Sequence, residues 1–427
     1  MTASTGDAGP RVLIIVENLP VPFDRRVWQE ATTLAERGYT VSVICPTGKG
    51  HGRRYEIIDG VHIYRHPLPL EASGALGYAL EYLSALLWQT LLAWRVFFSR
   101  GFDIIHACNP PDTIFLVAAP FKYLFGRAFV FDHHDLSPEL YEAKFGRRDT
   151  FYRLLCLLER LTFRLADRVI ATNDSYREIA VARGGKARSE VAVVRSGPSL
   201  TRLKVVDPDP EWKRSKRHLV GYVGVMGKQE GISYLLEAAR HITHEMGRDD
   251  VHFVLVGSGP ELDKLQCQAK ELGVSDVVEF AGFLPDDRLL TVLNTADVCV
   301  NPDEFNAMND LSTMNKIMEY MALAKPIVQF DMKEGRRSAR QASVYAKPND
   351  ARDFARRIVE LLDDPERRRE MGAFGRRRVE NDLSWDHEAP KLLALYARLW
   401  RSRVSARQPT GIGAGRWSST ADLKPRK

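Results

Sequence analysis

The sequence lacks the features that mark several common protein classes. Its five cysteines are scattered and odd in number, and no two have the spacing of metal ligands. We therefore interpret them as free thiols in a reducing compartment. No apolar run reaches the roughly 20 residues that a membrane-spanning helix needs. With 44% hydrophobic and 27% charged residues, the composition excludes a mostly disordered chain, a fibre and a polytopic membrane protein.

An excess of charge is also missing from most of the chain. The formal net charge of +6 comes from the tail Arg401–Lys427, which is rich in arginine and lysine. Without this tail the basic and acidic residues are equal in number. The high isoelectric point is therefore no sign of a nucleic-acid partner, and we expect none.

The chain begins as an α/β protein. Arg11–Glu17 is a continuous apolar, β-branched run, typical of a strand that is covered on both faces. Asp24 suits the N-cap of the helix that follows, and Val41–Cys45 is the next strand. A βαβ unit of this kind predicts parallel strands. Further strands are expected at His62–Arg65, Asp103–Cys108, Ala128–Asp132, Arg168–Thr172 and Glu190–Val194.

A second α/β series follows a polar stretch that contains three prolines. Its expected strands are Leu219–Val223, Val251–Val256, Val277–Phe280, Val298–Asn301 and Pro326–Gln329. Both halves have the size of a domain. We expect a disordered N-terminus (1–10), a first domain (11–197), a linker (198–216), a second domain (217–382), a helix packing back across the domains (383–402) and a basic disordered tail (403–427).

The most apolar stretch is Tyr82–Trp94. It is too short to cross a bilayer, and we favour a buried or cleft-lining helix. The alternative is a surface that rests on a membrane.

Glycine-rich loops follow the first two strands of the second half. Gly221–Gly231 contains four glycines and Lys228, and Gly257 begins the next loop. Glycines let the backbone approach a ligand closely, and free amides at a helix start suit phosphate. Neither loop has the dinucleotide or Walker A spacing. The alternative is an ordinary turn between strand and helix.

A polar loop, Pro302–Thr313, precedes a helix that carries Lys316 and Glu319. Residues three apart share a helix face, so the two side chains are either an ordinary surface pair or part of a site. A carboxylate can accept hydrogen bonds from two sugar hydroxyls, and we favour this role because apolar residues follow Glu319.

In the first half, His133 and His134 end a strand. Adjacent strand residues point to opposite faces, so we expect no metal site and instead one histidine that contacts a substrate. Arg25 and Arg26 begin the first helix, where positive charge is unfavourable, and we expect them to bind an acceptor phosphate.

Together these residues resemble the retaining glycosyltransferases of family four, which have the GT-B architecture. The resemblance covers about Arg11 to Trp400, and its most specific segment, Asn315–Pro326, resembles the subgroup that builds bacterial cell-surface polysaccharides. The other segments are Asp24–Ala31, His134-Asp135, Ala166–Thr172 and Val193–Pro198. It implies an α/β fold of two Rossmann-like domains with parallel sheets facing a central cleft, an N-terminal acceptor domain and a C-terminal nucleotide-sugar domain.

The resemblance also implies roles for individual residues. Glu319 holds the nucleotide ribose, Lys228 the diphosphate and His134 the donor sugar, and these three are the expected catalytic residues. The expected donor-binding residues are Gly224, Gly227, Gly257, Phe283, Leu284, Asn309, Asp310, Leu311, Ser312 and Lys316. No cofactor or metal is implied.

Three positions depart from the family pattern. Leu311 stands where many members have the first glutamate of a pair, with Asp310 beside it. No arginine precedes Lys228 at the usual place, and the glycine that commonly precedes the lysine after the Glu319 helix is absent.

We therefore expect a retaining, metal-independent glycosyltransferase that uses a nucleotide-sugar and a glycan or lipid-linked acceptor. A nucleotide-sugar epimerase and a non-catalytic partner that binds nucleotide-sugar are the alternatives. We expect a cytoplasmic protein with peripheral contact to an anionic membrane.

Overall fold

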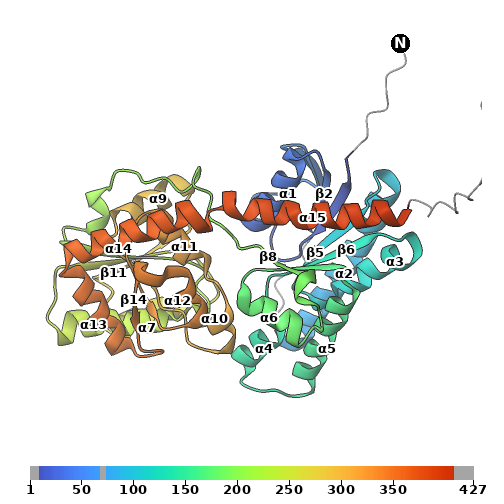
Figure 1. The fold of residues 1–427 in the computed structure, drawn as a ribbon. Helices are drawn as coiled ribbons and strands as arrows, with labels where there is room; N and C mark the ends of the chain where they lie inside the picture. The colour runs from blue at the N-terminus through green and yellow to red at the C-terminus, as the bar shows by residue number, and fades with distance from the viewer. Residues whose placement is uncertain (1–8, 68–73, 408–427) are drawn as a thin grey trace, which may run out of the picture.

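The computed structural model describes residues 9–67 and 74–407, which form two α/β domains joined by a connection and by the last helix (Figure 1). The predicted fold class of two Rossmann-like domains is confirmed. Residues 1–8 and 408–427, which carry most of the expected N-terminal and C-terminal tails, lie outside the described residues.

The first domain is built on an eight-stranded sheet with the order β3-β4-β2-β1-β5-β6-β7-β8. All neighbouring strands are parallel except β3 and β4, which are antiparallel. Every predicted strand of this half is present, and β3 is an addition that sequence analysis missed. The strands are β1 (Arg11–Ile15), β2 (Thr40–Pro46), β3 (Tyr55–Ile58), β4 (Val61–His66), β5 (Ile104–Cys108), β6 (Ala128–His133), β7 (Arg168–Ala171) and β8 (Val191–Val193).

The second domain has a six-stranded parallel sheet with the order β11-β10-β9-β12-β13-β14. Its five predicted strands are present within two residues of their expected bounds, and β14 is again an addition. The strands are β9 (His218–Val223), β10 (Val251–Val256), β11 (Val278–Gly282), β12 (Val298–Asn301), β13 (Ile327–Phe330) and β14 (Ser343–Ala346).

Helices cover both faces of each sheet, so the central strands are buried throughout. The Asp24 side chain accepts a hydrogen bond from the amide of Val27, as expected of an N-cap. The helices of the first domain are α1 (Arg25–Glu36), α2 (Gly74–Ser99), α3 (Phe115–Phe125), α4 (Ser137–Phe145), α5 (Thr150–Leu165) and α6 (Asp174–Ala182). Those that follow are α7 (Ile232–Arg240), α8 (Leu262–Glu271), α9 (Asp286–Thr295), α10 (Ala307–Leu311), α11 (Asn315–Ala322), α12 (Lys333–Ala339), α13 (Ala351–Leu362), α14 (Pro365–Arg378) and α15 (Trp385–Arg407).

The last helix, α15, leaves the second domain and lies along the first (Figure 1). It packs Leu392, Tyr396 and Leu399 into the apolar cluster that β1 and α1 form on one face of the sheet. It continues to Arg407, past the expected end of the helix at residue 402. The hydrophobic face of α15 therefore completes the core of a domain that lies about 200 residues earlier in the chain.

The structure corrects the preferred reading of the apolar stretch Tyr82–Trp94. Within α2, Ala85, Ala93 and Val96 are buried, but Leu83 and Leu87 on another face are 63% and 59% exposed. The helix is thus half-buried, with apolar residues on both sides. Among the described residues no helix combines the length and the apolar character that crossing a membrane requires.

Candidate functional site

The predicted donor residues gather at the carboxyl ends of the second sheet, and their loops are held together by close backbone contacts. A Cβ atom on Gly257 would lie 1.8 Å from the carbonyl oxygen of Gly224, and Gly257 has a φ of +140°. A Cβ on Gly231 would lie 2.0 Å from the carbonyl oxygen of Pro302. Only glycine permits these approaches, so the loops after β9, β10 and β12 form one surface.

The side chain of Lys316 connects two of the same loops through ion pairs. Its ammonium group is buried and lies 2.8 Å from Oδ1 of Asp303 and 2.5 Å from Oε2 of Glu230. It also lies over the ring of Tyr222. Burial raises the pKa of Asp303 to about 7, although the ammonium of Lys316 opposes the shift. The structure thus gives Lys316 an internal partner on each side, in place of the predicted direct contact with the donor.

Lys228 lies in a short helical turn, Lys228–Glu230, at the rim of this surface. It is exposed, and its ammonium group has no hydrogen-bond or ion-pair partner among the residues that the structure describes. Gly227 is buried beside it. An unengaged lysine next to tightly packed glycines has the freedom and charge to meet a phosphate.

The loop that precedes α11 is engaged within the protein. Asn309 is buried and donates to the carbonyl oxygens of Gln229 and Glu304 at 2.9 and 2.8 Å. Asp310 accepts through Oδ1 from the amide of Lys333, the first residue of α12, at 2.8 Å. Both side chains order the loop.

The next two positions of this loop meet the first domain. The carbonyl oxygen of Leu311 accepts from Asn173 at 2.9 Å, and the hydroxyl of Ser312 lies 3.0 Å from that of Tyr176. Of the predicted donor-binding residues Phe283 and Leu284, Phe283 is 69% exposed and Leu284 packs on the core. The ring of Phe283 lies 6.3 Å from that of Phe23 in the first domain. These contacts bring the two domains together along the cleft.

Glu319 lies in the cleft under two arginines. Its Oε1 lies 2.5 Å from Nη2 of Arg202 and 3.3 Å from Nη1 of Arg25. Both guanidinium groups also contact Oδ1 of Asp286, Arg202 at 3.3 Å and Arg25 at 2.8 Å. Arg25 therefore faces the second domain from α1, as a cleft residue should. Arg202 was missed, because it lies in the polar stretch that sequence analysis predicted as a linker.

The structure gives Arg26 a different place from the predicted acceptor site. Its side chain is 8% exposed and pairs with Asp132 at 3.0 Å and with Glu30 at 3.1 Å. A further Nη1 contact reaches the carbonyl oxygen of Val194 at 3.0 Å. With its donors engaged inside the domain, Arg26 is an internal counter-ion and not an acceptor ligand.

His134 lies against this ion pair. Its Nε2 is 2.6 Å from Oδ2 of Asp132, and its backbone amide donates to Asn109 at 2.7 Å. Burial would raise the pKa of Asp132, but the positive charge of Arg26, with His134, holds it well below the usual value. Burial and the charge of Asp132 raise the pKa of Glu30 well above its usual value. The Nε of Arg26 also donates to His134 Nε2 at 2.9 Å, so Asp132 and Arg26 orient the imidazole together.

Hydrogen bonds also connect Asp132 to the last helix through His106. His106 Nε2 lies 3.3 Å from Oδ2 of Asp132, and His106 Nδ1 lies 2.7 Å from the hydroxyl of Tyr396 on α15. Burial lowers the pKa of His106, which favours the neutral ring. Since Asp132 is ionised, Nε2 of that ring carries the proton and Nδ1 accepts from Tyr396.

Two groups of described residues lie close enough to share a metal ion: His106, Cys108 and Asp132, and Glu30, Asp132 and His134. Both share Asp132, whose oxygens already bond to the Arg26 guanidinium. Burial raises the pKa of the Cys108 thiol well above its usual value, which disfavours the thiolate that metals bind. His133 points away from His134 and lies 3.4 Å from Glu159, so the two histidines do not meet at one site.

Two family models match the chain. Residues 24–197 match a glycosyl transferase 4-like domain, and residues 207–378 match the glycosyl transferases group 1. Alpha-D-kanosaminyltransferase from Streptomyces kanamyceticus is 27% identical over 176 residues, which cover 39% of this chain and 44% of that protein. Alpha-maltose-1-phosphate synthase from Mycolicibacterium smegmatis is 27% identical over 305 residues, 65% of this chain and 74% of that protein. This chain thus spans less than half of the first of these relatives.

Solved structures share the fold over nearly the whole chain. Sucrose-phosphate synthase from Thermosynechococcus elongatus has a TM-score of 0.76 at 20% identity and covers 92% of this chain and 100% of that one. Anabaena HepE in complex with UDP-glucose has a TM-score of 0.67 at 15% identity, with 92% and 99% coverage.

The close contact at Gly257 predicts a large effect of one methyl group. Gly257→Ala should lower the free energy of unfolding by more than about 3 kcal/mol, because strain at positive φ adds to a clash with backbone. Gly247→Ala is the matched control: its φ is +66°, and nothing lies within 4 Å of the added Cβ. Urea unfolding of both variants measures the difference. Equal losses would contradict the close packing of the two loops.

Asp112 accepts a hydrogen bond from Asn109, the residue that also binds the backbone amide of His134. Its environment predicts that the free energy of unfolding depends on pH. Burial, reinforced by the charge of Glu159, raises the pKa of Asp112 to about 7. An unfolded aspartate ionises near pH 4, so the unfolded state loses its proton first and the free energy of unfolding falls as pH rises from about 4 to 7.

Asp112→Asn removes this contribution. The free energy of unfolding of the variant relative to the native protein should therefore increase from pH 4 to 7 and level off above. Urea unfolding at several pH values measures it, with the exposed Asp276→Asn as control. Parallel pH curves for Asp112→Asn and the native protein would rule out the raised pKa.

Proposed function

This chain belongs to the family 4 glycosyltransferases of GT-B architecture, and on that premise we propose that it transfers a sugar from a nucleotide-sugar donor to an acceptor hydroxyl. The observation that carries the proposal is the surface that the glycine loops after β9 and β10 form with the loop after β12, with Lys228 at its rim and Glu319 on α11 of the same domain. That HepE, which has the same fold, was solved with UDP-glucose supports a nucleotide-sugar donor.

The chemistry that we propose needs little covalent help from the protein. A nucleoside diphosphate is a leaving group whose negative charge grows as the anomeric bond breaks. Lys228 and the backbone amides of the neighbouring loops would stabilise that charge more in the transition state than in the bound donor. Glu319 would accept hydrogen bonds from the ribose, and His134, oriented by Asp132, would contact the donor sugar.

We propose further that the transfer retains the anomeric configuration and needs no metal. Metal independence is supported by the lysine and amides, which supply positive charge where a divalent ion would otherwise act. The acceptor hydroxyl would attack from the face that the diphosphate leaves, and closure of the two domains would exclude water.

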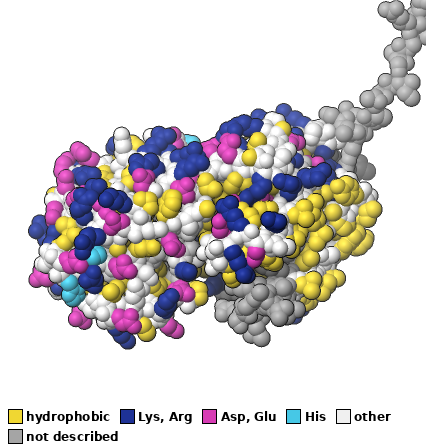
Figure 2. All heavy atoms as spheres, turned by 90° about the horizontal axis from the view of Figure 1, so that it is seen from below, with side chains coloured by type: hydrophobic (Ala, Val, Ile, Leu, Met, Phe, Trp, Pro, Cys, Tyr) yellow, Lys and Arg dark blue, Asp and Glu magenta, His cyan; other side chains and the backbone are white. Residues whose placement is uncertain are grey.

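The acceptor that we propose is a lipid-linked or polysaccharide precursor, reached by the first domain resting on an anionic membrane. Exposed apolar side chains gather at the end of the molecule at which α2 and α3 lie (Figures 1 and 2). Leu87 and Leu91 on α2 are 59% and 53% exposed, and Leu124 on α3 is 72% exposed. Exposed Arg95 and Arg100 on and beside α2 add positive charge, which favours an anionic bilayer.

Donor binding is the first test. A panel of UDP, GDP, ADP, TDP and their sugars in a thermal-shift assay with EDTA should give a shift with one nucleotide. At 100 times its dissociation constant a ligand stabilises by about 2.7 kcal/mol. Glu319→Ala should abolish the shift and sugar transfer. Asp286→Ala is the matched control, since Asp286 contacts the same two arginines without holding the ribose.

The outcomes separate the alternatives. Binding of a nucleotide without sugar transfer would favour a non-catalytic partner. This alternative is specific because Leu311 stands where many family members have a glutamate. A new hexose formed from donor alone, followed by NMR, would favour an epimerase. A shift that Glu319→Ala leaves intact would contradict the assignment of this residue.

Membrane contact is tested separately by vesicle co-sedimentation. The protein should bind phosphatidylglycerol-containing vesicles better than phosphatidylcholine vesicles, and salt should weaken binding. Leu87→Glu with Leu91→Glu should reduce the bound fraction several-fold. The control, Val205→Glu with Met246→Glu, changes exposed apolar residues outside the first domain. No binding of the native protein at any salt concentration would reject the membrane contact.

A further inference from the structure

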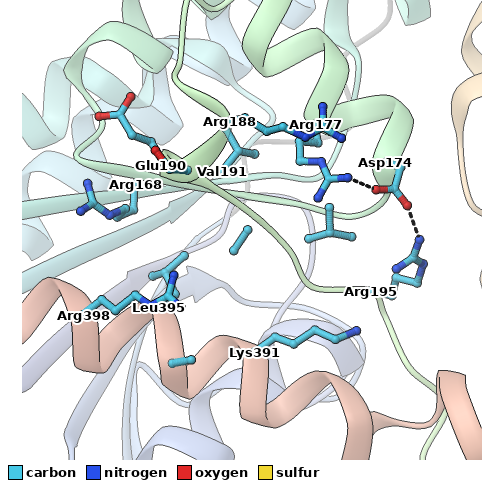
Figure 3. Close-up of a pocket in the computed structure, with 14 residues that line it drawn as sticks. Arg168, Asp174, Arg177, Arg188, Glu190, Val191, Arg195, Lys391, Leu395 and Arg398 are labelled. Carbon is cyan, nitrogen blue, oxygen red and sulfur yellow. Dashed lines mark hydrogen bonds and ion pairs between the residues drawn. The ribbon is translucent and has the colours of Figure 1, made fainter.

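A separate cavity of about 510 Å³ lies in the first domain, between strand β8, the start of α6 and helix α15 (Figure 3). It shares no lining residue with the candidate donor site. Its volume lies within the roughly 300–1,000 Å³ that small-molecule pockets have. Six basic side chains and two acidic ones line it; the basic ones are Arg168, Arg177, Arg188, Arg195, Lys391 and Arg398.

The two acidic side chains are already engaged. Asp174 bonds to Arg177 through one oxygen and to Arg195 at 2.8 Å through the other (Figure 3). Burial would raise the pKa of Asp174, but the hydrogen bond from Arg195 and the surrounding arginines lower it. Glu190 accepts from the amide of Ala187 at 3.0 Å. Neither carboxylate lies in an ion pair with Arg168 or Arg398.

Two arginines therefore bring uncompensated charge to the cavity. Among the described residues, the guanidinium group of Arg168 donates only to the carbonyl oxygen of Asp167 at 2.7 Å, a neutral group. Arg398 is exposed, and its guanidinium group has no hydrogen-bond or ion-pair partner among the described residues. They enter from opposite walls, β7 and α15 (Figure 3). Arg188 pairs with Glu178 and Lys391 with Glu388, and neither glutamate lines the cavity.

The floor of the cavity suits a bound group as well. β8 pairs with β7 alone, so its other edge has no neighbouring strand in the described sheet. Val191, Ala192 and Val193 of this strand line the cavity together with Leu395 of α15. The ligand would therefore meet guanidinium groups on its sides and a small apolar surface beneath.

We propose that this cavity binds a phosphate-bearing ligand that is distinct from the sugar donor. A guanidinium presents paired N–H donors that match two oxygens of a phosphate, and two of them on facing walls can hold a diphosphate or two phosphate esters. The wall on α15 lies outside both segments that match the family models.

The experiment is calorimetric titration with inorganic pyrophosphate at low ionic strength. It is done in a Lys228→Gln background, so that the proposed donor site does not bind the probe. Arg168→Gln with Arg398→Gln should raise the dissociation constant at least tenfold. The control, Arg352→Gln with Arg369→Gln, removes two charges from arginines that are 71% and 75% exposed in the second domain, and should change it less than twofold.

A double variant that conserves charge distinguishes the paired N–H donors of arginine from positive charge alone. Arg168→Lys with Arg398→Lys keeps the positive charge and should weaken binding to an intermediate extent. Equal dissociation constants for the glutamine pair and its control, or no saturable binding by the Lys228→Gln parent, would overturn the proposal. Thermal unfolding of each variant checks the fold, and the readout needs no sugar transfer, so it is independent of the proposed activity.

Vesicles distinguish the two sources of phosphate. If the ligand is a lipid headgroup, the glutamine pair should lose binding to vesicles that contain phosphatidic acid as well as binding to pyrophosphate. If it is a soluble phosphate ester, only pyrophosphate binding should fall. Loss of neither would reject the site.

Discussion

The buried ion pair between Arg26 and Asp132 is the interaction on which the candidate site depends. Removing two charges from water is costly, and a buried pair survives only when its remaining hydrogen bonds are made. Asp132 has such partners in Arg26, His106 and His134. The same carboxylate thus anchors the start of α1, two central strands and the imidazole that faces the cleft. Loss of Arg26 would leave the Asp132 carboxylate buried without its guanidinium partner, and loss of Asp132 would leave Arg26 with Glu30 as its remaining acidic partner among the described residues.

The second domain uses the same principle around a cation. The buried ammonium of Lys316 holds Asp303 and Glu230, which lie in the loops after β12 and β9. Glycine contacts then bring those loops within backbone distance of one another. The site surface is therefore built by one internal charge cluster in each domain, while exposed Lys228 and the Glu319 carboxylate remain for ligands. Because Glu319 already accepts from Arg25 and Arg202, a ribose would have to share or displace those bonds.

The sequence allowed the architecture to be predicted because buried parallel strands appear as apolar runs. β3 and β14 were missed because each is an edge strand of only four residues, too short to give a clear apolar run. The glycine loops and Glu319 were identified from their position after strands. The role of Arg26 was not, since a basic residue at a helix start gives no sign that a buried carboxylate 106 residues later will neutralise it. Likewise, helical spacing put Lys316 and Glu319 on one face, but only the packing of two distant loops turns the lysine inward.

The helix α15 joins these separate features. It begins beside the second domain. The hydroxyl of Tyr396 on this helix bonds to His106, His106 contacts Asp132, and Asp132 contacts His134. Within two residues of Tyr396 on the same helix, Leu395 and Arg398 form a wall of the basic cavity. A helix of fixed geometry cannot shift at one of these points without shifting at the other. A ligand held by Arg398 would therefore also restrain the hydroxyl that orients His106, which gives the cavity a direct physical connection to the imidazole in the cleft.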